Sequence, residues 1–181
     1  MAFAVSLLFN AEISAAISAR WNMLAGAGVP HSMLDLGYPP HVSLAVYDEL
    51  DVGTALASLD RAFGRVAQIP VTLTGFSTFG AGSGVCYAAL QTSPELDALH
   101  ESTIEVTGGS CRLHYQRGHW TPHCTLAVGL TDAEMDRARH VLESDWQFLE
   151  GVFEAAELVE FVPVVSLRRW KLSVPRSGRT T

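Results

Sequence analysis

Two short segments of the chain place a histidine two positions before a hydroxyl residue. Residues 40–46 read PHVSLAV and residues 122–128 read PHCTLAV, so five of the seven positions are identical and a sixth exchanges serine for threonine. The histidines of the two segments are His41 and His123, and the 123 − 41 difference puts them 82 residues apart. A match of this length within one small domain indicates an internal duplication.

The residue types in these segments suit acid–base chemistry on a phosphodiester. Alternation along a strand puts His41 beside Ser43, and His123 beside Thr125, on the face opposite the apolar residues. One imidazole can take a proton from the attacking oxygen while the other protonates the leaving oxygen. The two hydroxyls can bind the non-bridging phosphate oxygens. This chemistry needs no cofactor, and the chain shows no carboxylate cluster for a metal ion. We therefore predict neither.

The loops before the two segments contain candidates for further substrate contacts. Arg117 could hold a phosphate through its guanidinium group, and Tyr115 or Trp120 could stack on a base. Tyr38 occupies the corresponding place before the first segment and is a possible stacking residue as well. The alternative is an ordinary surface loop in which one tryptophan serves as an anchor.

Other polar residues have simpler interpretations. His114 and His119 could join His123 in a zinc site, but their spacing fits no common zinc pattern. Arg168 and Arg169 lie in a predicted strand, so one of them could point into a cleft. The remaining histidines are expected on the surface: His31, His100 and His140.

The order strand, helix, strand, strand follows each proline–histidine step. The predicted strands are 2–9, 41–47, 69–79, 84–91, 123–128, 152–162 and 164–173. The predicted helices run from the Asn10 cap to about Gly26, over 54–66, from Pro94 to about Val106, and from the capping box Thr131–Glu134 to about Leu149. Four aromatic residues are expected in the core: Trp21, Phe63, Phe79 and Trp146.

Composition narrows the class of protein and its partners. Of 181 residues, 48% are apolar and 17% charged, with a net charge of −7. No basic stripe appears in the sequence, so a nucleic-acid partner should be a short end or a nucleotide. Three cysteines without a C-x-x-C pair indicate a reducing compartment, and no apolar run reaches the length of a membrane helix. We expect a cytoplasmic monomer with no membrane or protein partner. One domain should cover 1–174 as two pseudo-symmetric halves, followed by a mobile tail, 175–181.

The two tetrads His41-Val42-Ser43-Leu44 and His123-Cys124-Thr125-Leu126 resemble the paired motifs of the 2H phosphoesterases. That group includes bacterial 2′-5′ RNA ligase-like proteins and cyclic nucleotide phosphodiesterases. The resemblance implies a bilobal α+β fold in which two antiparallel sheets line a central cleft and helices lie outside. It also implies one histidine from each lobe. The resemblance favours His123 as the base and His41 as the acid, and the near symmetry of the two tetrads leaves the reverse assignment open.

The function expected from this resemblance is metal-independent cleavage of a cyclic phosphate. Candidate substrates are a 2′,3′-cyclic nucleotide, an RNA end, and ADP-ribose 1″,2″-cyclic phosphate. One alternative is a 2′-5′ RNA ligase that acts on tRNA halves. Another is a non-catalytic module that binds a nucleotide or an RNA end.

Overall fold

The computed structural model describes residues 1–80, 82–108 and 110–175. Its strands are β1 (Ala2–Phe9), β2 (His41–Tyr47), β3 (Ile69–Thr78), β4 (Cys86–Leu90), β5 (His123–Ala127), β6 (Leu149–Phe161) and β7 (Val165–Lys171). Its α-helices are α1 (Ala11–Gly26), α2 (Ser32–Asp35), α3 (Val52–Phe63), α4 (Pro94–Thr107) and α5 (Asp132–Asp145). A 3₁₀ turn, η1, covers Leu113–Tyr115. The predicted strands and four long helices are present, whereas α2 and η1 were not predicted.

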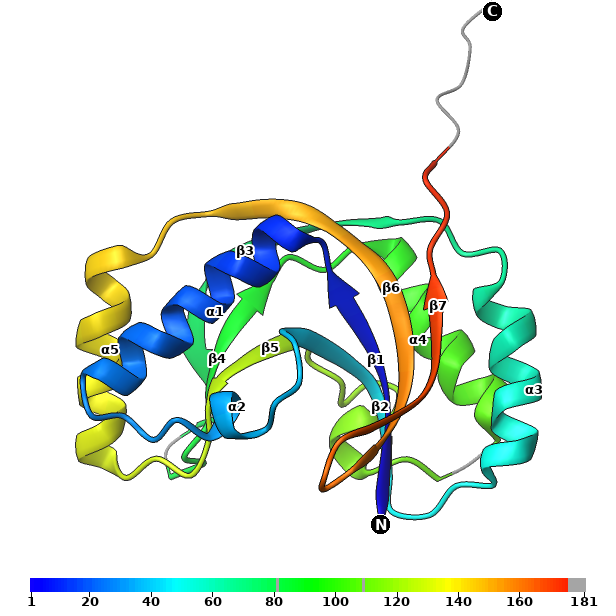
Figure 1. Ribbon diagram of the computed structural model, residues 1–181, viewed down its shortest axis with the longest axis horizontal. Coiled ribbons are helices and arrows are strands. Elements are labelled where there is room, and N and C mark those ends of the chain that lie inside the picture. The colour runs from blue at the N-terminus through cyan, green and yellow to red at the C-terminus, as the bar shows by residue number, and fades with distance from the viewer. Residues whose placement is uncertain (81, 109, 176–181) are drawn as a thin grey trace, which may run out of the picture.

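The strands form one continuous antiparallel sheet rather than the two separate sheets expected. The strand order is β2-β1-β6-β3-β4-β5, and β7 also pairs with β6. The 13-residue strand β6 is long enough to serve both lobes: its first residues pair with β3, and the rest pairs with β1 and β7. Figure 1 shows β6 arching from one lobe to the other. The α+β class and the outer position of the helices are confirmed.

The helices pack in pairs at the two ends of this arch. Helix α3 contacts α4 beside β2, while α1 contacts α5 and β5 in the other lobe (Figure 1). Helix α1 therefore follows a strand of one lobe but covers the other. Leu44 and Leu126, on the buried faces of the two motif strands, lie in the core.

Capping hydrogen bonds from nearby side chains explain why the sequence predicted where these helices begin. The hydroxyls of Ser93 and Thr131 accept hydrogen bonds from backbone N–H groups three residues later, and Thr131 forms the full capping box with Glu134. Asn10 makes no such side-chain cap. The last helix ends at Asp145, and Leu149 starts β6 because it pairs with Leu73 of β3.

Three of the four expected core aromatics lie in or against the core. Trp21 and Phe63 are buried, and Trp146 packs against the core half-buried. Phe79 was predicted wrongly: it is 42% exposed because it follows the last residue of β3, where the sheet ends. In the described part of the chain, no helix has the length and apolar character needed to cross a membrane. Residues 176–181 of the predicted tail lie outside the described residues.

Candidate active site

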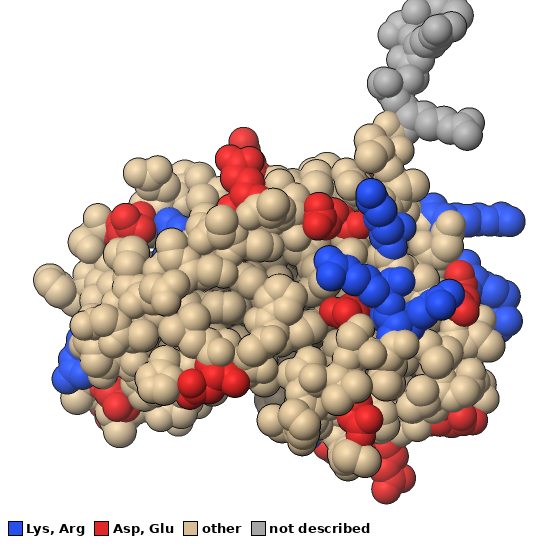
Figure 2. All heavy atoms as spheres, viewed as in Figure 1, with Lys and Arg blue, Asp and Glu red and all other residues tan. Residues whose placement is uncertain are grey.

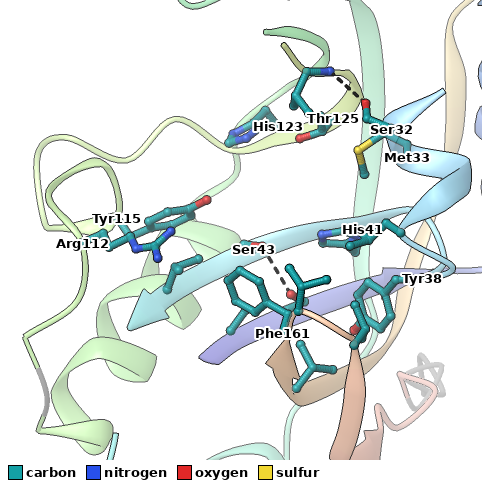
Figure 3. A pocket seen from close by; sticks show the side chains of 18 residues that line it. Ser32, Met33, Tyr38, His41, Ser43, Arg112, Tyr115, His123, Thr125 and Phe161 are labelled. Carbon is teal, nitrogen blue, oxygen red and sulfur yellow. Dashed lines mark hydrogen bonds between the residues drawn. The ribbon is translucent and has the colours of Figure 1, made fainter. Parts of the chain in front are cut away.

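The two motif strands lie at opposite ends of the sheet and meet because the sheet curves. Strands β2 and β5 are the first and last in the strand order, yet they contact each other. His41, Ser43, His123 and Thr125 are half-buried and line one cleft of about 340 Å³. Figure 3 shows both imidazole rings at this cleft, one from each strand. Alternation puts each histidine beside its hydroxyl residue, as predicted, and the curvature of the sheet brings the two pairs to one cleft.

Each motif strand is held at its open edge by a tryptophan. The Trp120 indole N–H donates to the backbone carbonyl of Ser43 at 3.0 Å, and the Trp21 indole N–H donates to that of Thr125 at 3.1 Å. Both carbonyls lie on edge strands, where a strand partner is missing on one side. The same kind of anchor thus positions both hydroxyl residues.

This anchoring role differs from the predicted base stacking of Trp120. The Trp120 ring stacks on His100, with ring centres 4.0 Å apart and an interplanar angle of 6°. It is not among the residues that line the cleft. His100, expected on the surface, is only 4% exposed because it lies under this ring and bonds to the carbonyl of Tyr115.

The chain just before each motif sets the tautomer of its histidine. His41 Nδ1 lies 2.9 Å from the carbonyl oxygen of Pro39, and His123 Nδ1 lies 2.7 Å from that of Thr121. A carbonyl oxygen only accepts, so each Nδ1 carries the hydrogen. Each neutral ring then keeps its Nε2 lone pair for proton transfer.

Both imidazoles hold protons weakly. Burial lowers the pKa of His41 from 6.5 to about 4, against the opposing effect of the bond to Pro39. The charge of His123 lowers this pKa further, whereas the carboxylate of Glu157 raises it. Burial also lowers the pKa of His123. An anionic phosphate in the cleft would raise both values, because opposite charge favours the protonated ring.

A buried carboxylate supports the ring of His41 through Tyr38. The Tyr38 ring meets His41 edge-on at 4.7 Å between ring centres, and its hydroxyl donates to Glu157 Oε2 at 2.7 Å. Glu157 is 5% exposed and accepts a second hydrogen bond from Ser166. Burial and the adjacent Glu157 raise the pKa of Tyr38, so the phenol remains a donor. Tyr38 does line the cleft, as predicted for a substrate contact.

The positive charge in the cleft wall belongs to Arg112 and not to Arg117. Arg112 lines the cleft, and its guanidinium donates twice to Asp48. Its backbone N–H bonds to Val46 of β2 at 2.8 Å, which sets it beside the motif strand. Arg117, predicted to bind phosphate, is exposed outside the cleft and pairs with Glu105 at 3.6 Å. The long-range contact with β2 thus places Arg112, and not Arg117, at the cleft.

Tyr115 lines the cleft between Arg112 and Ser43 (Figure 3). It is half-buried, and burial raises the pKa of its phenol against the opposing effects of Arg112 and Ser43. Its ring is therefore placed for the substrate contact that the sequence predicted.

Aromatic rings also surround the second histidine. Phe79 stacks on Tyr87 with ring centres 4.3 Å apart, and it meets His123 edge-on at 4.8 Å. The exposed position of Phe79 thus places it against a predicted catalytic residue. Both imidazoles are held by aromatic edges, although the rings come from different elements.

Much of the remaining cleft wall is apolar and comes from the segment around α2, from the end of β6 and from the turn that follows it. These residues are Met33, Leu36, Phe161, Val162 and Val164. A nucleobase has faces of matching character, whereas a phosphate does not. The cleft therefore combines a polar centre with an apolar wall.

The zinc arrangement considered for His114, His119 and His123 is not formed. His114 and His119 are exposed on the loop and do not line the cleft with His123. Among the described residues, no three histidine, cysteine, aspartate or glutamate side chains are grouped closely enough to hold a metal ion.

The paired motif strands at one cleft agree with the resemblance to the 2H phosphoesterases, and comparison with known families supports that class. Residues 13–162 match the 2′-5′ RNA ligase superfamily. The match covers most of the chain, so the protein belongs to this superfamily, that of the 2H phosphoesterases and 2′-5′ RNA ligase-like enzymes. No curated protein sequence matches the chain.

Solved structures share the fold at low sequence identity. TT0787 of Thermus thermophilus is 17% identical, with a TM-score of 0.63, over 97% of this chain and 100% of that one. A protein described as a phosphoesterase is 16% identical, with a TM-score of 0.57, over 94% and 97% of the two chains. E. coli LigT complexed with 3′-AMP is 17% identical, with a TM-score of 0.58, over 94% and 96%.

Proposed function

We propose that the protein is a metal-independent phosphodiesterase that cleaves a cyclic phosphate on a nucleotide or an RNA end. The observation that carries this proposal is the pair of Nε2 atoms, from His41 and His123, left available at one cleft by their Nδ1 bonds. The cyclic phosphodiester that this histidine pair could cleave is present in a 2′,3′-cyclic nucleotide, in a cyclic phosphate at an RNA end and in ADP-ribose 1″,2″-cyclic phosphate.

The reaction assigns one proton transfer to each histidine. His123 Nε2 takes a proton from water, and the water oxygen forms a bond to phosphorus. The bond from phosphorus to one ribose oxygen breaks, and protonated His41 gives its proton to that oxygen. The hydroxyls of Ser43 and Thr125 donate to the non-bridging oxygens, where negative charge is held during the transfer.

We assign His41 as the acid from the family resemblance; among the causes that shift its pKa, Glu157 acts in this direction, against the larger effect of burial. The carboxylate of Glu157 raises the proton affinity of His41. His123 has no carboxylate among the causes that shift its pKa. Binding of the anionic substrate would supply the additional increase that lets His41 carry a proton near neutral pH.

The apolar wall suits the nucleoside part of such a substrate. A base can pack against Phe161 or Met33, with Tyr38 and Tyr115 as stacking candidates on either side of Ser43. Nucleotides in the cleft are also consistent with the related LigT structures, which were solved with 3′-AMP, NADP+ and ATP. We propose that the protein acts without a protein partner and without a membrane. The three free, buried cysteines are consistent with a reducing compartment such as the cytoplasm, and we propose that the protein is a monomer.

The direct test is hydrolysis of the four nucleoside 2′,3′-cyclic monophosphates in excess EDTA. We expect turnover by the wild type and losses of about 10²–10⁴-fold in His41→Ala and in His123→Ala. His31→Ala and His140→Ala are matched controls, because both of these histidines are exposed outside the cleft. Near wild-type turnover in either motif variant would contradict the mechanism.

The same assay separates the alternatives. Ligation of tRNA halves uses the same bond in reverse, and the superfamily match includes ligase-like proteins in its description. Joining of RNA halves without hydrolysis of mononucleotides would favour the ligase. Nucleotide binding without any product would favour a binding module.

A further inference from the structure

Half of the described cations of this acidic protein lie on or beside β7. Arg168, Arg169 and Lys171 lie on β7, and Arg61 and Arg65 lie in and just after α3, which contacts β7. All five are exposed, and they are half of the ten lysine and arginine residues that the structure describes. Figure 2 shows blue side chains gathered beside β7. We call these five residues the β7 basic face.

Most of this charge is not neutralised. Arg168 pairs with Asp60 at 3.1 Å, and the Trp170 indole donates to the same carboxylate. Across the described residues, no ion pair within 4.0 Å involves the other four cations. The face therefore carries a local positive charge although the chain as a whole has a net charge of −7.

The basic face begins at the wall of the cleft. Arg169 of β7 pairs in register with Glu157 of β6, whose carboxylate bonds to the cleft residue Tyr38. Directly paired residues project from the same side of a sheet. Arg169 therefore emerges on the cleft side, and its charge acts on Tyr38 by lowering that phenol's pKa. Lys171, two residues further along the strand, lies on the same side at about 7 Å.

We propose that the β7 basic face binds the phosphate backbone of a single-stranded RNA whose cyclic phosphate end lies in the cleft. This inference rests on the proposed function. A mononucleotide is confined to the cleft, whereas the next phosphates of an RNA strand pass Arg169 and then Lys171. Regularly spaced cations beside a phosphate-binding cleft match a polyanion that enters at its end.

The test compares two substrates that differ only in the presence of a backbone. The double variant Arg169→Ala/Lys171→Ala is measured with a 2′,3′-cyclic mononucleotide and with a short oligoribonucleotide ending in the same cyclic phosphate. We expect the ratio of kcat/KM for the oligomer to that for the mononucleotide to fall by about 5–10-fold at low salt, since two phosphate contacts are lost. Taking the ratio removes any indirect effect of Arg169 on His41 through Glu157.

Binding supplies a readout that does not depend on catalysis. The affinity for a fluorescent oligoribonucleotide ending in a 3′-phosphate is measured across a salt series. Loss of two contacts should reduce the slope of log K against log salt by about 1.4. The matched control is Arg137→Ala/Arg139→Ala, which removes the same charge from exposed positions on α5 in the other lobe.

The outcomes are distinct. A loss confined to the β7 variant supports the inference, and equal behaviour of the two double variants overturns it. If the β7 variant loses binding to anionic vesicles but keeps its RNA affinity, the face serves a membrane and the inference is wrong. If mononucleotides are not hydrolysed but RNA affinity still depends on Arg169 and Lys171, the catalytic proposal fails and the RNA-binding face stands.

Discussion

Replacement of Glu157 by glutamine tests how the charge behind His41 controls its proton. Glu157→Gln keeps the size of the side chain and an oxygen acceptor for one of its two hydroxyl partners, Tyr38 or Ser166, but removes the negative charge. Because that charge raises the pKa of His41, its removal should lower the pKa. The sign does not depend on whether His41 acts as the acid or as the base.

The geometry sets the size of the effect. The Tyr38 ring centre is 4.7 Å from that of His41, and the Tyr38 hydroxyl is 2.7 Å from the carboxylate. With the tyrosine ring between them, charge and imidazole are at most about 10 Å apart, and an effective dielectric constant of about 20 then gives about 1.7 kcal/mol. That energy corresponds to a decrease of roughly one pKa unit for His41.

The assay is an NMR titration of the His41 ring nitrogens in protein saturated with inorganic phosphate. The phosphate brings the titration into an accessible range, and His41→Ala identifies the signals. Ser166→Ala is the control, because it removes one hydrogen bond to Glu157 but keeps the charge. A His41 midpoint within about 0.3 unit of wild type in Glu157→Gln would refute the electrostatic reasoning.

Two further predictions follow from the buried histidines and the tryptophan anchors. The pKa of His41 is about 4 in the folded protein and about 6.5 in the unfolded chain, so its contribution to stability is full above pH 6.5 and is lost as pH falls toward 4. Urea unfolding from pH 7 to 4.5 should show a decline of at most about 1.4 kcal/mol per pH unit from this residue, and an equal slope in His41→Ala would contradict its assignment. Trp120→Phe removes the indole N–H that bonds to Ser43 and should cost about 1–2 kcal/mol of stability together with a lower kcat. The same urea measurement and the cyclic nucleotide assay check this, and an unchanged kcat would show that the anchor does not position Ser43.

The sequence alone was sufficient for the residues whose placement depends on short-range rules. The two-residue period of a strand predicted that His41 and Ser43 share a face, as do His123 and Thr125, and all four line the cleft. Side-chain caps at Ser93 and Thr131 act within a few residues, so their helix starts were readable. The internal repeat showed that the two histidine segments are equivalent before any contact between them was known.

Long-range pairing decided the rest of the site. Glu157 and Arg112 carried no signal in the sequence, because their importance comes from contacts with Tyr38 and with β2 far along the chain. For the same reason, the sequence did not show that Arg112 lines the cleft whereas Arg117 lies outside it.

The β7 basic face also depends on contacts between distant segments that the sequence did not predict. No basic stripe appears along the chain, yet α3, which carries Arg61, packs against β7, which carries Arg168, Arg169 and Lys171. Local periodicity determines which way a side chain points from its own element. Only the curvature and register of the sheet determine which other elements it meets, and those depend on pairings such as that of β1 with β6, between residues more than a hundred positions apart.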